Sequence, residues 1–287
     1  MTELPELPEN RKIRIGAVSY LNTMPLIYGL GQASPPLEVV LDLPSRLADR
    51  LANAELDVAL VPVVEAVSNP VYTIVSDACI ACRGPVGSVK LFSRVPFEKI
   101  ERLTLDEGSR TSVILSKIIL RERFGVSPVC EPLLIDQEWT ETSAEAALVI
   151  GDRAMHNLDH ELLASRGFEF EMDLGEYWNE WTGLPFVFAV WAARPATELS
   201  VDLQSVDAVL TAARDQGMAS LDTICDVAYA ERGFEKTEAR DYLTNNLHFY
   251  LGELEKRGLQ LFFEHAKRHN LLDSKLDLQF YDCQTAG

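Results

Sequence analysis

The segment LTLDEGSRTSVILSKIIL, residues 103–120, carries the densest group of polar side chains next to an apolar helix pattern. After a glycine turn, Ser109, Arg110, Thr111 and Ser112 stand where the helix is expected to begin. Hydroxyls, free N–H groups of a helix N-terminus and a nearby guanidinium are groups that bind anions. Simple N-capping by Ser109 or Thr111 explains one hydroxyl, but not three together with an arginine. The segment therefore favours an anion-binding site.

The segment SYLNTMP, residues 19–25, places polar groups directly after the first apolar-alternating run. Asn22 offers an amide donor and acceptor but no useful titration, so it orients a ligand rather than acting as an acid or base. Ser19 adds a hydroxyl at the end of the expected strand. We expect these two residues to face a ligand, with Tyr20 and Leu21 packed beneath them.

Two further loops carry candidate groups. GPVGSVKLFS, residues 84–93, places Gly87 and Ser88 before a strand. Glycine there lets a ligand approach the backbone, and a plain tight turn explains it equally well. In VIGD, Gly151 and Asp152 follow a buried strand, where loops of α/β sheets usually meet ligands. Asp152 is a candidate base, and it also fits as the N-cap of the following helix.

Tryptophans and histidines give less specific patterns. Trp178, Trp181 and Trp191 either pack an internal contact or line a site for a flat ring, and Trp178 is retained as a candidate substrate contact. Two histidine pairs have the i, i+4 spacing of metal ligands: His156 with His160, and His265 with His269. Neither pair has a third ligand in register, so we expect solvated helix faces and no metal site.

The elements that position these groups form two α/β series. Strand patterns at residues 12–18, 37–44 and 57–63 alternate with helical ones, which is typical of a mainly parallel sheet. The second series has strands at 103–106 and 146–152 and a helix at 111–124. The chain returns through the apolar strand 186–193, and from about residue 200 onward the pattern predicts helices only.

We therefore expect two lobes. Lobe 1 comprises residues 1–96 plus 188–287, an α/β unit with C-terminal helices, and lobe 2 is an inserted α/β unit at residues 97–187. Two segments that cross between lobes make a hinged cleft, the usual place for a small ligand.

The charge balance limits the partners. Acidic residues number 44 against 26 basic ones, and the net charge of −18 repels polyanions, which argues against nucleic acid and anionic membranes. The amino-terminal stretch MTELPELPENRK lacks the basic and apolar segments of a secretory signal, so we expect a cytoplasmic protein. The sequence does not indicate an oligomeric state.

The chain resembles the chorismate dehydratase family of the futalosine route to menaquinone. The resemblance spans nearly the whole chain and rests on RIGAVSYLNTMPLIYGL, LDVALVPVVEA, GSVKLFS, LTLDEGSRTSVIL, AALVIGDRAM and DLGEYWNEWTGLPFVFAVW. It implies a two-lobed periplasmic-binding-protein-like fold of type II, without an export signal. It also implies an enzyme that removes water from chorismate to give 3-[(1-carboxyvinyl)oxy]benzoate, with no metal or organic cofactor.

Two alternatives stay open beside the dehydratase. A sister enzyme of the pathway, which makes 1,4-dihydroxy-6-naphthoate, shares the fold, but its members carry a catalytic His-Glu pair where this chain has Gly151 and Asp152. They also lack the SYLN pattern in the first loop, so both departures favour the dehydratase. The other alternative is a non-catalytic cytoplasmic protein that binds a small anion.

The implied substrate is a dianion, which sets the expected contacts. Thr111 and Ser112, with Ser109 or Arg110, are expected to bind one carboxylate, assisted by Ser88. The full set of expected substrate contacts is Ser19, Ser88, Ser109, Arg110, Thr111, Ser112, Gly151 and Trp178.

Aromatisation of the ring drives the implied reaction, so the protein needs mainly to hold the substrate and help hydroxide to leave. We expect Asn22 to orient a carboxylate or the departing hydroxyl. The proton goes either to a substrate carboxylate or to Asp152, the rival protein base. Asn22 and Asp152 are therefore the expected catalytic residues.

Overall fold

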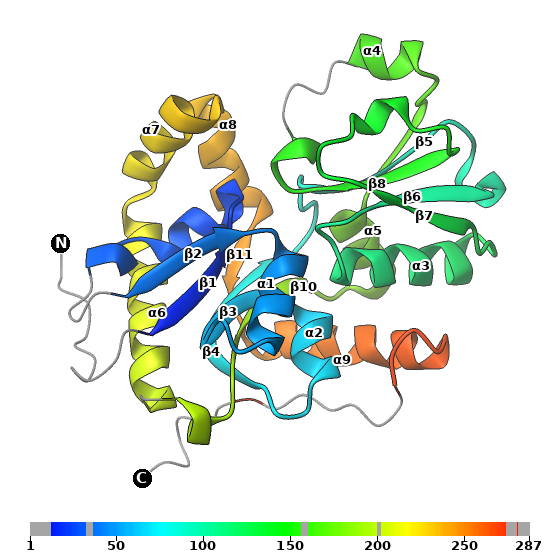
Figure 1. The fold of residues 1–287 in the computed structure, drawn as a ribbon. Helices are drawn as coiled ribbons and strands as arrows, with labels where there is room; N and C mark the ends of the chain where they lie inside the picture. Colours follow the sequence, from blue (N-terminus) through cyan, green and yellow to red (C-terminus); the bar gives the residue numbers. More distant parts are fainter. Residues whose placement is uncertain (1–12, 33–36, 156–159, 200–201, 274–279, 281–287) are drawn as a thin grey trace.

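Two separate β-sheets organise the chain into two lobes, which lie side by side in Figure 1. The computed structural model describes residues 13–32, 37–155, 160–199, 202–273 and 280. The architecture is that of a two-lobed α/β protein, as expected from the sequence.

The first sheet has six strands in the order β11-β4-β10-β3-β1-β2. They are β1 (Arg14–Val18), β2 (Glu38–Asp42), β3 (Val58–Pro62), β4 (Thr73–Cys82), β10 (Phe186–Ala193) and β11 (His248–Tyr250). β1 runs parallel to β2 and β3, whereas β10 is antiparallel to β3 and β4. Every residue of β3 and β10 is buried, which explains why both segments are continuously apolar.

Helices cover both faces of this sheet. α1 packs on β3, α6 on β4 and α9 on β10. The α-helices of this lobe are α1 (Pro44–Ala52), α2 (Val63–Ser68), α6 (Leu203–Ala219), α7 (Leu221–Arg232), α8 (Lys236–Asp241) and α9 (Glu253–Arg268). The shorter helices are η1 (Leu21–Ile27), η2 (Leu30–Gln32), η6 (Ala196–Glu198) and the π-helix η7 (Tyr242–Asn246).

The second sheet has five strands in the order β7-β6-β8-β5-β9. They are β5 (Val89–Ser93), β6 (Arg102–Asp106), β7 (Val129–Leu133), β8 (Ala146–Ile150) and β9 (Phe170–Asp173). The helices of this lobe are α3 (Thr111–Arg123), α4 (His160–Ser165), α5 (Leu174–Thr182), η3 (Phe97–Lys99), η4 (Trp139–Glu141) and η5 (Gly151–Ala154). Within the described ranges, no helix is long and apolar enough to cross a membrane.

Strand pairing moves the boundary between the lobes. The expected split after residue 96 would leave β5 in lobe 1, but β5 pairs with β8 and β9 in the second sheet. The returning strand β10 already belongs to the first sheet from Phe186, two residues before the expected position. The chain therefore passes from the first lobe to the second at Gly87 and returns at residues 183–185. The returning strand is antiparallel, so the first sheet is mixed rather than mainly parallel.

The expectation of helices only after residue 200 is wrong around Tyr242. The region that was expected to be helical contains α8, the π-helix η7, the strand β11 and the start of α9. β11 pairs antiparallel with β4, where His248 lies opposite Ala81, so it adds an edge strand to the first sheet. Apolar spacing alone did not separate this edge strand from a helical stripe.

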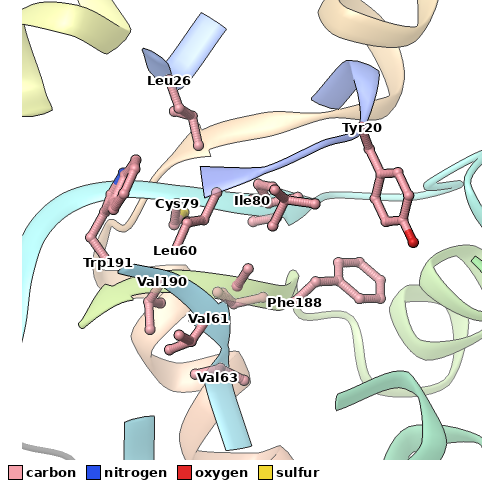
Figure 2. Close-up of a cluster of buried hydrophobic side chains, with 14 of the residues drawn as sticks. Tyr20, Leu26, Leu60, Val61, Val63, Cys79, Ile80, Phe188, Val190 and Trp191 are labelled. Atoms are coloured by element: carbon pink, nitrogen blue, oxygen red, sulfur yellow. The ribbon is translucent and has the colours of Figure 1, made fainter. Parts of the chain in front are cut away.

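The apolar core of the first lobe extends towards the second lobe. Figure 2 shows Trp191 at one end of a buried cluster and Tyr20 with Phe188 at the other end. Trp191 is fully buried, whereas Tyr20 and Phe188 each keep 8% of their surface exposed. This end of the core therefore forms a wall of the space between the lobes.

Candidate active site

A cavity lies between the lobes, where the carboxyl ends of several strands meet. Its empty volume is ≈ 510 Å³, which includes a part that is open to solvent. The polar lining residues are Tyr20, Asn22, Ser88, Ser109, Arg110, Thr111 and Ser112. Apolar residues such as Pro62, Ile80 and Phe188 complete the wall. Seven of the ten expected site residues line this cavity: Asn22, Ser88, Ser109, Arg110, Thr111, Ser112 and Gly151.

Asn22 reaches the cavity from the first turn of η1, which follows β1. Leu21 beside it is fully buried and anchors the turn, while Asn22 keeps 8% of its surface exposed. The Asn22 side-chain carbonyl accepts a hydrogen bond from the Thr23 hydroxyl over 3.2 Å. Thr23 thus fixes the orientation of the amide at the cavity wall.

Ser88 lies opposite, at the crossover into the second lobe. The Tyr242 hydroxyl donates to Ser88 Oγ over 2.8 Å, and both residues are buried. Burial raises the pKa of Tyr242, while its hydrogen bonds with Ser88 and Asn22 act in the opposite direction. The π-helix η7 therefore brings a tyrosine into contact with two expected site residues.

Gly87 makes the turn that presents Ser88. Its φ is +76°, a conformation that favours glycine, and both Val86 N and Gly87 N donate to the Asp173 carboxylate, over 3.0 Å and 2.6 Å. Asn246 from η7 donates to the Pro85 carbonyl over 2.9 Å. The tight turn therefore accounts for the glycine at position 87.

The N-terminus of α3 opens onto the cavity without a side-chain cap. The N-cap residue is Arg110, and neither Ser109 nor Thr111 caps the helix, so the alternative of simple N-capping is wrong. Thr111 is 3% exposed, and its hydroxyl has no hydrogen-bond partner among the described residues. A helix N-terminus beside a buried hydroxyl that lacks a hydrogen-bond partner is suited to bind an anionic group.

Arg110 lines the cavity, but its guanidinium is engaged elsewhere. It forms ion pairs with Asp49 of α1 over 2.6 Å and with Glu65 of α2 over 3.0 Å. Both partners belong to the first lobe, so Arg110 ties the α3 terminus to that lobe. Its charge is matched by two carboxylates, which makes Ser109, not Arg110, the fitting companion of Thr111 for a ligand carboxylate.

Asp152 does not line the cavity. Its Oδ1 accepts from Leu21 N over 3.0 Å and its Oδ2 pairs with Arg232 over 3.0 Å. Arg232 also donates to the Ser19 carbonyl over 2.7 Å. This geometry does not fit the expected base role of Asp152 or the expected ligand contact of Ser19. Through their contacts with Arg232, Ser19 and Asp152 instead connect the loop after β1, the helix α7 and the second lobe.

The alternative that Asp152 caps the next helix does not fit either, because Asp152 lies inside η5, whose N-cap is Ile150. Gly151 before it has a φ of +66°, and its N–H donates to the Ser88 carbonyl over 2.8 Å. Gly151 contributes backbone to the cavity wall and leaves room for the ring of Tyr20.

Trp178 belongs to an aromatic cluster away from the cavity wall. It is fully buried, contacts Trp181, Phe186 and Phe262, and donates from Nε1 to the Pro185 carbonyl over 3.2 Å. This packing does not fit the expected substrate contact. The aromatic ring that β10 presents to the cavity is Phe188.

Three residues were not expected to have a role at the site: Tyr20 lines the cavity, whereas Tyr242 and Arg232 contact expected site residues. Tyr20 was visible in SYLNTMP, but nothing in the sequence distinguishes a packed tyrosine from one that faces a cavity. Tyr242 and Arg232 come from the C-terminal helices, far along the chain from their partners. Among the residues described, no three of His, Cys, Asp or Glu come together as a metal site requires. His156 lies outside the described residues.

Comparisons with known proteins bear on both family and fold. A family model described as menaquinone biosynthesis matches residues 13–268. The chain is 28% identical over 267 residues to the chorismate dehydratase of Thermus thermophilus, covering 87% of this chain and 93% of the relative.

The similar solved structures have the periplasmic-binding-protein fold. An Archaeoglobus fulgidus protein superimposes with a TM-score of 0.71 at 17% identity, covering 91% of this chain and 98% of that one. The Escherichia coli aliphatic sulphonate binding protein gives a TM-score of 0.59 at 14% identity, covering 94% and 91%. At such identities these structures establish the fold alone, which is the type II fold expected from the sequence.

Proposed function

Because the chain belongs to the menaquinone biosynthesis family, we propose that it is a chorismate dehydratase, a carbon–oxygen lyase. It removes water from chorismate to give 3-[(1-carboxyvinyl)oxy]benzoate, as a step of the futalosine route. The named relative supports this choice over the sister enzyme that makes 1,4-dihydroxy-6-naphthoate. The cytoplasmic location expected from the sequence stays a prediction.

The observation that carries the proposal is the pairing of an uncapped helix N-terminus with Asn22 across one cavity. The α3 terminus supplies N–H groups and the Thr111 and Ser112 hydroxyls, which suit a carboxylate. These groups favour an anion locally, although the whole chain carries a net charge of −18. Asn22 offers both a donor and an acceptor to a second polar group of the ligand.

The lining also supports a proton acceptor within the substrate. None of the described residues that line the cavity is an aspartate, glutamate or histidine. A carboxylate of chorismate can take the ring proton, the C–H electron pair enters the aromatic ring, and the C–O pair leaves with the hydroxyl group. The accepted proton and the departing hydroxide together make the water that is lost.

Purified protein incubated with chorismate tests the proposal. We expect loss of the cyclohexadiene absorbance together with a product lighter by one water. Unchanged chorismate that nevertheless binds would favour a non-catalytic binding protein, which this fold also supports. Unchanged and unbound chorismate would point to the sister enzyme, whose substrate differs.

A further inference from the structure

Tyr20 carries a buried hydroxyl at the cavity that lacks a partner. The residue is 8% exposed, and its hydroxyl has no hydrogen-bond partner among the described residues. The two other buried tyrosines in the described part are both partnered: Tyr72 by Asn69 and Tyr242 by Ser88. Since a buried donor without a partner costs free energy, the Tyr20 hydroxyl suits a group that arrives with the ligand.

The position of the ring places this hydroxyl against the second lobe. A Cβ atom at Gly151 would lie 2.7 Å from the Tyr20 ring, and one at Gly108 would lie 3.2 Å from its hydroxyl oxygen. Glycine at these two positions therefore makes room for the tyrosine. Figure 2 shows the hydroxyl pointing away from the apolar cluster, and Tyr20 lines the cavity together with Asn22 and Thr111.

Tyr20 offers a neutral phenol that can donate a hydrogen bond. Burial, with the nearby carboxylates of Asp106 and Asp152, raises the pKa of its hydroxyl, so the phenol keeps its proton. A neutral phenol donates well to an oxygen on which negative charge develops, and such a bond strengthens in the transition state.

We propose that the Tyr20 hydroxyl donates a hydrogen bond to the departing hydroxyl oxygen of bound chorismate, an inference that rests on the proposed dehydratase function. The C–O bond breaks with its electron pair on oxygen. The proton that completes water comes from the substrate carboxylate that took the ring proton, and Tyr20 retains its own. The Thr111 hydroxyl, on the opposite lobe, remains available for the carboxylate.

The variant Tyr20→Phe separates this role from packing, because it keeps the ring against Gly151 and removes only the hydroxyl. We expect kcat for chorismate to fall about 10- to 100-fold with KM changed less than threefold, since the bond forms chiefly in the transition state. The melting temperature without ligand should stay equal or rise, because an unpartnered buried hydroxyl is removed. The matched control Tyr72→Phe should leave kcat unchanged.

Several outcomes overturn the inference. Wild-type kcat and KM in Tyr20→Phe would show that the hydroxyl does not contact the substrate. A raised KM with wild-type kcat would show that the hydroxyl binds the substrate without stabilising the transition state further. A large fall in melting temperature would assign Tyr20 a structural role. An inactive wild-type protein overturns the proposed function and this inference with it, whereas an active wild type with an equally active variant overturns this inference alone.

Discussion

Asp152 shows how the local sequence and the contacts of a residue can indicate different roles. Its position after a buried strand is typical of ligand loops, which made it a candidate base. In the structure both of its carboxylate oxygens are engaged, by Leu21 N and by Arg232. Since its partners come from η1 and α7, the residue contributes to the contact between the lobes rather than to the cavity wall.

The variant Asp152→Asn distinguishes these two roles. A catalytic base contributes on the order of 10² to 10⁴ in rate, so its loss would abolish most turnover. We expect instead that kcat stays within about threefold and that stability falls by about 1 kcal/mol, because a partly exposed ion pair is lost. Steady-state kinetics and urea unfolding give the two quantities.

Arg232→Gln provides the second half of that test, since it removes the ion pair, together with the hydrogen bond to the Ser19 carbonyl, and leaves the Asp152 carboxylate in place. We expect it to behave like Asp152→Asn, and the exposed Asp136→Asn should behave like the wild type. A hundredfold loss of kcat in Asp152→Asn alone would restore Asp152 as the base.

At the scale of elements, α3 is the helix on which substrate binding depends. Its N-terminus faces the cavity without a cap, and Arg110 fixes it to α1 and α2 through Asp49 and Glu65. A helix terminus held in this way presents its N–H groups in a constant direction. The anion site predicted from the segment SRTS therefore rests on helix geometry as much as on the side chains.

Thr111→Val tests this helix terminus. Valine has nearly the same shape but no hydroxyl, so we expect KM for chorismate to rise about tenfold while the melting temperature does not fall. Ser116→Ala on the same helix is the matched control, because the Ser116 hydroxyl donates to the Val113 carbonyl within the helix. Equal KM values for Thr111→Val and the wild type would count against the carboxylate contact.

The individual helices and strands differ in how well the sequence predicted them. α3 and β10 were expected at almost their observed bounds, because an apolar helix that follows a glycine turn and a fully apolar strand have clear patterns. The π-helix η7 and β11 were missed, since strand pairing with β4 overrides a helical pattern that is local. The contact of Tyr242 with Ser88 followed from this topology, so the sequence did not indicate it.

At the scale of the whole molecule, several side-chain contacts join the two lobes. The ion pair of Asp152 with Arg232 lies near the loop after β1. A second contact joins Glu122 of α3 to the C-terminal end of α9. Glu122 Oε1 lies 2.6 Å from His265 Nδ1 and 2.8 Å from His269 Nε2. The histidine pair expected on a solvated helix face therefore joins the two lobes.

This contact gives a pH dependence with a definite sign. Burial by itself raises the pKa of Glu122, but the hydrogen bonds from His265 and His269, with the charge of Arg268, outweigh it and leave the pKa lowered. A carboxyl whose pKa is lowered by folding stabilises the protein above its unfolded pKa, about 4.3. That stabilisation is lost as the pH falls through the lower folded pKa.

Glu122→Gln should therefore cost about 1 kcal/mol of unfolding free energy at pH 7, and the difference from the wild type should shrink as the pH falls below about 4. Urea unfolding at several pH values measures it, with the exposed Glu231→Gln as control. A difference that grows on acidification would show that the sign is wrong.

The most direct test of the whole proposal is the mass of the product formed from chorismate by the purified wild-type chain and by Asn22→Ala. We expect the wild type to convert chorismate completely into a product lighter by one water. Asn22→Ala should form it at least about 100-fold more slowly, because the amide that orients the reacting group is gone. Unchanged chorismate with the wild type, or equal rates for the two proteins, would contradict the proposed dehydratase and its site.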